Sequence, residues 1–588
     1  MRSVARIRRL VRDDQTHLVD LTAHFFRRLF DSEFISRDAE AHLGVMHILA
    51  LLAVPAIFYT FYVSPVYGYV YWHFSWSLYD AVCISDQCRY VLFSMVVIGI
   101  VTVVEWDRLF PDGRDYAILM PLPLKLRNIF CAKIAALLIF VGLFILAVAS
   151  FPTLFYPVIE VGGTLREGPL GHLVWLMAAH GIAVFSGCLF MFLFFVALQG
   201  ALIVLLSHAQ FERVSLYVQG LATIFLSCQF FLLPLIPQVL PEWEQARNPV
   251  LYALPPMWFL GLYRILVGTQ DALFLSLSRI AILAFAISAV VAVLTYIACY
   301  RRHAQMAFES SEEKRPARLG LDRLVTRLLD SLWLKNARER ATFYFVLKTL
   351  DRNSKHRLYF VAYVAVGVAF ALLGIMEMMT HSAEPSLWAS AARPDKALLS
   401  IPLIVSFFTL VGMRAAFDFP AELPANWIFR ITDENNGKEC LSGVRKAMIA
   451  LAIVPLFATV LVVYSALWGF AASLLPTLFG VLLALILVEL LLYSYHKIPF
   501  TCSHLPGKLN LPLTGAIYWL VFTCYGYSMA TLEEWMFHVP MAWIVVLGVE
   551  AVILNRLMAH RNRALASGQG VEYEDRPVPA VQTLDLNA

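Results

Sequence analysis

The sequence carries little charge, and it lacks the motifs that hold nucleotides or support hydrolysis. Charged residues make up only 15% of the 588 residues, whereas hydrophobic residues make up 60%. Because a soluble domain is usually about half apolar and about a quarter charged, this composition excludes a chain built mainly of soluble domains. No G-x-x-x-x-G-K-[ST] loop, H-E-x-x-H or G-x-S-x-G motif occurs. We therefore predict that this chain is not an enzyme and needs no cofactor of its own.

Cysteine and histidine show no metal-binding pattern. The nine cysteines lack zinc-site spacing, and most stand alone within apolar runs, where a small buried thiol is the expected role. His496, Cys502 and His504 are close together, but their spacing fits no common metal site. Cys83 and Cys88 lie on the predicted outer side, where a disulfide and two free thiols remain as alternatives. No metal site is predicted.

Long apolar runs are the main feature that the sequence does contain. Runs of roughly 18 to 28 residues match a hydrocarbon core about 30 Å thick. We predict an all-α, polytopic integral membrane protein with about twelve transmembrane helices. The predicted spans are residues 43–64, 89–106, 129–150, 172–197, 215–239, 273–299, 357–378, 397–417, 447–470, 473–495, 514–532 and 539–557.

Basic residues predict how these spans are oriented. Residues 1–42 contain eight Lys and Arg and residues 300–357 contain fourteen, whereas the loop 65–87 contains none. Because positively charged loops stay on the cytoplasmic side, we expect both termini and the central segment to be cytoplasmic, in the inner or plasma membrane. Attraction to the anionic headgroups of membrane lipids explains the basic start of the chain better than nucleic-acid binding does.

The spans and polar segments divide the chain into two halves. A cytoplasmic amphipathic segment, 1–42, precedes a six-helix membrane half, 43–300. A cytoplasmic linker with an amphipathic helix, 301–356, leads to a second six-helix half, 357–557. The tail, 558–588, is polar and rich in proline, glycine and acidic residues, so we predict a disordered cytoplasmic end.

The two halves share a layout. Each begins with an amphipathic helix, over His17–Phe34 and Leu319–Leu332, in which apolar residues recur at three- and four-residue spacing. Each also has a polar, proline-containing cytoplasmic segment between its second and third spans, and these segments end at Lys133 and Lys446. This repeated layout predicts a diverged internal duplication.

Several polar side chains lie inside or beside the predicted spans. His180, Arg279, Glu489 and Glu550 lie within spans, where ionisable groups usually face the bundle interior or a water-filled path. A substrate pathway and hydrogen bonding between helices remain as alternatives, and Glu489 and Glu550 are candidates for an acid pair. The aromatic residues of the loop 65–79 are typical of an interfacial belt, with contact to an amphipathic substrate as the alternative.

Two segments resemble a known family. Asp107–Lys133, with the turn Met120-Pro-Leu-Pro-Leu124, resembles the cytoplasmic coupling segment of type-2 ATP-binding-cassette (ABC) permeases. Asn248–Gly268 resembles the outer segment that precedes the last span of a six-helix unit in that family. The resemblance covers roughly residues 17–300, and the second half fits by layout only.

The resemblance implies a permease subunit of an ABC-type transporter, an exporter, with two six-helix units fused in one chain. A separate ATP-binding-cassette ATPase subunit would supply the energy, and short charged segments bounded by prolines would transmit its movement to the spans. The implied ATPase-coupling residues are Asp112, Arg114, Asp115, Pro121, Pro123, Lys125 and Arg127 in residues 107–128, and Asp418, Glu422, Trp427 and Arg430 in residues 418–430.

Two other functions remain open from the sequence. One is a secondary transporter driven by an ion gradient, which would use acids within the membrane. The other is a membrane-embedded enzyme acting on lipid or polyprenyl substrates, for which the sequence shows no catalytic cluster. The sequence names neither the substrate nor the direction of transport.

Overall fold

The computed structural model describes residues 18–29, 41–73, 76–110, 119, 126–161, 170–309, 330, 333–334, 336–381, 394–419, 429, 431, 437–493, 495–501, 511–566 and 571. Every regular element among them is a helix, and these residues contain no β-strand. The predicted all-α class is therefore confirmed.

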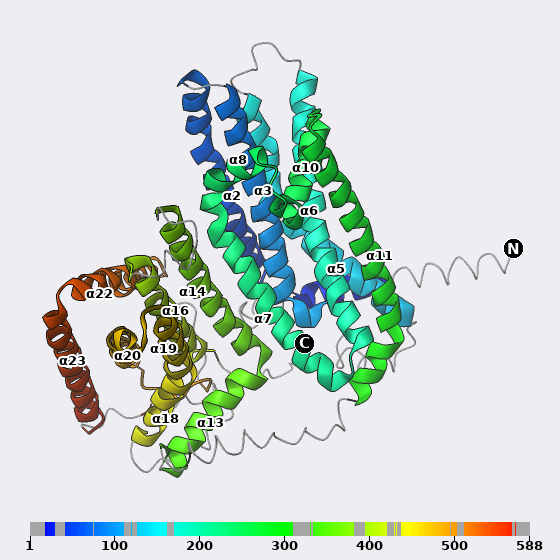
Figure 1. Cartoon of the computed structure of the whole chain (residues 1–588). Helices are drawn as coiled ribbons and strands as arrows, with labels where there is room; N and C mark the ends of the chain where they lie inside the picture. The colour runs from blue at the N-terminus through cyan, green and yellow to red at the C-terminus, as the bar shows by residue number, and fades with distance from the viewer. Residues whose placement is uncertain are drawn as a thin grey trace, which may run out of the picture. The chain divides into compact units, whose positions relative to one another are not determined.

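The chain forms two compact units, Met1–Arg315 and Pro316–Ala588, coloured blue to green and green to red in Figure 1. The boundary between them falls inside the predicted linker, 301–356. Of the two predicted amphipathic helices, residues 18–29 are helical, whereas 319–332 lies outside the described residues except for Asp330.

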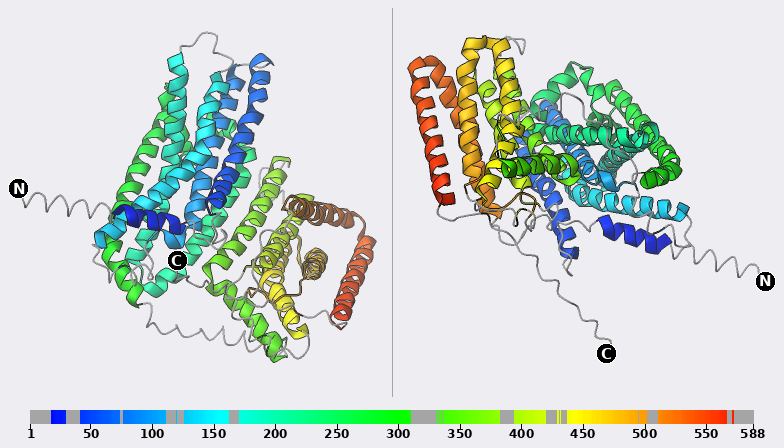
Figure 2. Two further views of the ribbon diagram at one scale, coloured as in Figure 1. Left: turned by 180° about the vertical axis from the view of Figure 1, so that it is seen from behind. Right: turned by 90° about the horizontal axis from the view of Figure 1, so that it is seen from below.

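Unit 1 is a bundle of long helices that run side by side in every view of the chain (Figures 1 and 2). After helix 18–29 its elements are α2 (Ala41–His73), α3 (Trp76–Val104), η1 (Trp106–Arg108), α5 (Leu126–Val161), α6 (Leu170–Leu205), α7 (His208–Leu232), η2 (Leu233–Leu235), α8 (Ile236–Gln245), α9 (Val250–Ala253), α10 (Pro255–Val267) and α11 (Ala272–Glu309). Prolines inside α2 and α5 do not end these helices. Neighbouring helices and local backbone adjustment allow this within a bundle.

We call the end of unit 1 that holds helix 18–29, η1 and the start of α5 its basic end, and the other end its far end. At the far end the chain enters the bundle again between α8 and α11. Cys88 Sγ lies 3.7 Å from Met257 Sδ near the start of α10, and Arg264 near its end pairs with Asp80 at 3.0 Å. The helix α10 therefore rises along α3 toward the far end, where Gly268 ends it with φ +105°.

A glycine in α10 allows this re-entrant segment, α8–α10, to pack closely. A Cβ atom at Gly261 would lie 2.6 Å from Leu277 Cβ and 3.0 Å from the carbonyl oxygen of Phe274, both in α11. Only a residue without a side chain fits this approach. The neighbouring Phe259 is fully buried against Phe190 of α6, with ring centroids 5.4 Å apart.

Unit 2 contains a connecting helix followed by a second set of long helices. Its elements are α13 (Ala337–Arg352), α14 (Ser354–His381), α16 (Lys396–Ala416), α18 (Lys438–Met448), η4 (Ile449–Ile453), α19 (Val454–Trp468), α20 (Phe470–Leu491), α21 (Leu511–Thr523), η6 (Cys524–Ser528), α22 (Met529–His538) and α23 (Pro540–Ala566). η4 and η6 are single π-helical turns that widen otherwise continuous helices. The basic end of unit 2 is the one that holds α13 and the start of α18.

Ten helices of the described part are long and apolar enough to cross a membrane. They correspond to ten of the twelve predicted spans, which supports a multi-pass membrane protein. The other two predicted spans, 43–64 and 514–532, are helical in α2 and in α21–α22 but are not among the ten. The side of the membrane on which the termini lie stays a prediction.

The predicted loop 65–87 is wrong. Helix α2 continues to His73 and α3 begins at Trp76, so most of this region is helical. Its aromatic residues divide between two environments, because Tyr67 is buried in the bundle whereas Tyr69 is 59% exposed. A run of tyrosines and tryptophans can extend a helix beyond the apolar core, and hydropathy alone does not detect that extension.

Candidate functional site

In unit 1, the end of α3 is fixed to α6 and α7 by hydrogen bonds at the basic end. Trp106 is fully buried, and its Nε1 donates to Ser215 Oγ at 2.7 Å. Gln199 Nε2 donates to the carbonyl oxygen of Trp106 at 2.9 Å, and Gln219 Nε2 donates to that of Val103 at 3.0 Å. The end of α3 and the residues that follow it, up to Trp106, are therefore held firmly in the bundle.

The chain returns to the bundle at a second fixed point, the start of α5. Helix 18–29 packs there, and Lys133 Nζ lies 5.0 Å from the ring centroid of Phe25. Arg108 Nη1 donates to the carbonyl oxygen of Leu29 at 3.0 Å and pairs with Glu105 at 3.2 Å. Burial raises the pKa of the Glu105 carboxyl, and the charge of Arg108 opposes that shift.

The basic end of unit 2 has a similar anchor after its second long helix, α16. The backbone N–H of Phe500 donates to the carbonyl oxygen of Phe417 at 3.0 Å. A ring nitrogen of His356 lies 3.0 Å from the carbonyl oxygen of Phe419. Arg414 pairs with Asp418 at 2.8 Å. The end of α16 and the residues up to Phe419 are therefore also held firmly.

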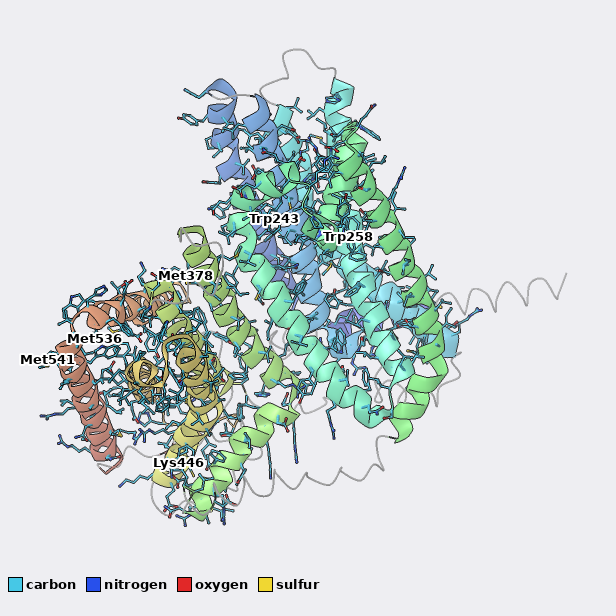
Figure 3. The ribbon with its side chains drawn as sticks, in the orientation of Figure 1. Trp243, Trp258, Met378, Lys446, Met536 and Met541 are labelled. Carbon is cyan, nitrogen blue, oxygen red and sulfur yellow. The ribbon has the colours of Figure 1, made fainter. Side chains whose placement is uncertain are left out.

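The last turn of α18 is held to the connecting region before α14. Lys446 Nζ donates to the carbonyl oxygen of Trp333 at 2.6 Å and pairs with Glu339 at 2.8 Å. The ammonium group also lies 5.7 Å from the centroid of the Trp333 ring, and Figure 3 labels Lys446. In both units, a lysine in the third long helix therefore lies over an aromatic ring. In unit 1 this is Lys133 over Phe25, and in unit 2 it is Lys446 over Trp333.

The predicted coupling residues lie mostly between these anchors. Residues 105–125 separate α3 from α5, and residues 417–437 separate α16 from α18, so the two connections have the same length. Arg127 is exposed in the first turn of α5, and the side chain of Asp418 is 45% exposed beside Arg414. Outside the described residues lie Asp112, Arg114, Asp115, Pro121, Pro123, Lys125, Glu422, Trp427 and Arg430.

The far end of unit 1 contains a buried polar cluster that the sequence did not point to. Glu160, at the end of α5, accepts hydrogen bonds from Gln87 Nε2 at 2.8 Å and from the Tyr263 hydroxyl at 2.9 Å. The Tyr79 hydroxyl donates to the carbonyl oxygen of Glu160 at 2.5 Å. This glutamate therefore ties α3, α5 and α10 together. It lies beyond the predicted span 129–150, and for that reason it was not a candidate.

His180 belongs to the same region. It is buried, and its ring packs against Tyr90, Tyr156 and Tyr263 with centroids 5.5 to 5.8 Å apart. Its inward position agrees with the expectation for an ionisable group within a span. Arg279 does not follow that expectation, because it is exposed on the surface of α11. Its place close to the far end of that helix lets a long side chain reach polar surroundings.

Glu489 and Glu550 were candidates for an acid pair, but Glu489 has arginines as its partners. Glu489 is buried at the basic end of unit 2, where it pairs with Arg445 and with Arg561 at 2.7 Å. Glu550 lies elsewhere on α23, where it is buried and its Oε2 has no hydrogen-bond partner among the described residues. Positions in sequence could not reveal these partners, because they come from helices far apart along the chain.

Cys83 and Cys88 are both free and buried on α3, so the disulfide alternative is excluded. Within the part of the chain that the structure describes, no group of three or more His, Cys, Asp or Glu side chains is placed to hold a metal ion. His504 and Cys502 lie outside that part.

Comparison of this chain with family models, with curated proteins and with solved structures gives no match. The resemblance to ABC permeases therefore depends on residues 107–133 and 248–268 and on the layout of the two halves.

Proposed function

We propose that this chain is the permease subunit of an ABC-type exporter, with two six-helix units in one polypeptide and ATP hydrolysis in a separate subunit. The two connections 105–125 and 417–437 would receive the ATPase. The re-entrant segment α8–α10 occupies the place of the family's outer segment before the last span, which adds support from the first unit.

One observation carries this proposal, namely that the same arrangement recurs at the basic end of both units. In each unit the second long helix ends at a buried, hydrogen-bonded anchor, marked by Trp106 and Phe417. A connection of equal length follows, and a lysine within the first few turns of the third long helix, Lys133 in α5 or Lys446 in α18, lies over an aromatic ring.

The anchors suit a mechanical role. A segment attached at both ends to buried backbone transmits a push to the helices, because close-packed interiors deform little. Charged residues between the anchors can pair with a soluble partner and set its register more than its affinity. A segment joined through flexible linkers would absorb the same displacement.

The first experiment is purification of the tagged chain from native membranes, with identification of any ATPase that accompanies it. The second reverses two charges at once, Asp115→Arg with Arg127→Glu, so that net charge is unchanged. We expect the ATPase to stay bound while ATP hydrolysis no longer drives transport. The matched control exchanges the charges of the exposed far-end pair Arg247 and Asp271, which are 3.6 Å apart. It should transport normally.

Two results would remove this function. Purification without any ATPase would leave the permease without its energy source. Full transport by the Asp115/Arg127 variant with a bound ATPase would show that the connection 105–125 does not couple hydrolysis to transport. Transport that survives ATP depletion but stops with an uncoupler would favour the ion-gradient-driven alternative.

A further inference from the structure

The last helix of unit 2, α23, has an outward face that changes from apolar to basic along its length. The helix lies at the edge of its unit, where it packs against α20 and α22 (Figure 1). The exposed residues on this face recur at three- and four-residue spacing, and they are Met541, Val545, Val549, Val552, Arg556, His560 and Arg563. Because residues at that spacing lie on the same side of a helix, they form one continuous strip, which we call the outer stripe of α23.

The apolar part of the outer stripe has the length of one leaflet of a bilayer. It begins at Met541, which Figure 3 labels, and ends at Val552. At about 1.5 Å per residue, these residues extend over about 16 Å. Half of a hydrocarbon core about 30 Å thick is about 15 Å. An acyl chain that points from the headgroups toward the middle of the bilayer can therefore lie along this part.

The basic part of the outer stripe has no acidic partner among the described residues. Residues 551–566 contain three arginines and no aspartate or glutamate. Arg561 faces the bundle and pairs with Glu489 at 2.7 Å. Arg556 and Arg563 are exposed instead, and neither forms an ion pair with any described residue. These two guanidinium groups are therefore open to an anion from outside the bundle.

A tyrosine beside the basic part indicates its depth in the membrane. Tyr493, just after α20, is 56% exposed, and its ring stacks on His560 with centroids 5.4 Å apart. Tyrosine rings gather at the level of the lipid headgroups. On the inner side of α23, one carboxylate, Glu489, is shared by Arg445 and Arg561, so positive charge also exceeds negative charge there. The end of α23 therefore presents surplus positive charge at headgroup depth.

We propose that the outer stripe of α23 binds an anionic phospholipid, with the phosphate on Arg556 and Arg563 and an acyl chain along the apolar part. The two arginines are two helical turns apart, about 10 Å, and His560 lies between them, so all three can face one headgroup. Guanidinium groups suit a phosphate because they stay charged and offer several N–H donors. A zwitterionic lipid fits less well, since its own cation offsets the phosphate. The site requires no ATPase and does not depend on the function proposed above.

Native mass spectrometry of the full chain in detergent tests this, because it counts the lipids that each chain retains. The probes are phosphatidylglycerol, phosphatidylcholine and glycerol 3-phosphate, the last of which carries a phosphate without acyl chains. The wild-type chain should bind the first phosphatidylglycerol more tightly than phosphatidylcholine. It should retain no glycerol 3-phosphate, because the apolar part of the outer stripe then has nothing to bind.

The decisive variant is Arg556→Gln with Arg563→Gln. It should weaken the binding of the first phosphatidylglycerol about 25-fold, since each basic residue near anionic lipid contributes about fivefold. Its binding of phosphatidylcholine should not change. The matched control removes two exposed basic side chains from α13, Arg340→Gln with Lys348→Gln, and should keep the wild-type affinity for phosphatidylglycerol.

Four outcomes would overturn the site. Equal binding of phosphatidylglycerol and phosphatidylcholine by the wild-type chain decides the matter even if the variants fold poorly. Equal losses in the two double variants would show that lipids respond to total charge and not to the outer stripe. Retention of glycerol 3-phosphate as tight as that of phosphatidylglycerol would assign the arginines to a soluble phosphate. A lipid-free mass of two chains that the Arg556/Arg563 variant loses would assign this face to a second copy.

Discussion

In unit 1, α8, α9 and α10 lie between the long helices α7 and α11, and Glu160 ties α10 to the bundle. In unit 2, only the turn at Val539 lies between α22 and α23. The basic ends are alike, with a buried anchor, connections of equal length and a lysine–aromatic contact in each. The two units therefore have the same arrangement at one end and different arrangements at the other.

The two ends of the units also differ in the partners of their buried acidic side chains. At the basic ends, buried acids are matched by cations, as Glu489 is by Arg445 and Arg561. At the far end of unit 1, Asp86 pairs with Arg89 but Glu160 accepts hydrogen bonds from neutral donors, and in unit 2 neither Glu533 nor Glu550 pairs with a cation among the described residues. Cations at the basic ends can reach water and headgroups, whereas deep in a bundle each charge requires a dedicated partner.

The largest expected effect comes from removing the carboxylate at the basic end of unit 2. Glu489→Ala leaves Arg445 and Arg561 facing each other without compensation. We expect a loss of about 3 kcal/mol in the free energy of unfolding, since breaking a buried ion pair strands its partners. Denaturant titration in micelles measures it. The partly exposed pair Arg338–Glu439, at 3.7 Å, provides the control, because Glu439→Ala should cost less than about 1 kcal/mol. Equal losses in the two variants would contradict the interpretation.

A smaller effect is expected at the far end of unit 1. Glu160→Ala removes the acceptor of Gln87 and Tyr263, and leaving such buried donors unpaired costs about 2 kcal/mol. Hydrogen exchange should speed up in Pro255–Val267, while unit 2 stays unchanged. The exposed Glu242 on α8 is the matched site, where an alanine should change stability by less than about 0.5 kcal/mol. Unchanged exchange in α10 would show that other contacts hold the re-entrant segment.

The smallest expected loss of stability tests whether the lysines at the two basic ends have the same role. Lys133→Met and Lys446→Met both remove a cation from an aromatic ring, which costs about 1 kcal/mol in a partly buried site. Lys446→Met also leaves the buried Glu339 without its ion pair, so it should cost about 1 kcal/mol more. Thermal unfolding of the two variants in the same detergent compares them. A larger loss for Lys133→Met would mean that the two lysines are not equivalent.

Much of the helical fold could be predicted because span length is a local property. Apolar runs located α5, α6, α11 and the ten spans that the structure supports. The same reasoning failed at 65–87, where tyrosines continue a helix past the apolar run, and it missed Glu160 for the same reason. Helix α10 also interrupts the simple alternation of span and loop, since a re-entrant segment is too short to register as a span.

The sequence by itself determined that this chain is helical and multi-pass, because the thickness of the hydrocarbon core and the need to satisfy backbone groups leave few other choices. It also indicated a repeated layout, through Lys133 and Lys446. Only the tertiary structure decided which charges meet, as Glu489 does with Arg445 and Arg561. Such pairs join different helices, and their contacts depend on how the helices are rotated and packed, which hydropathy does not encode.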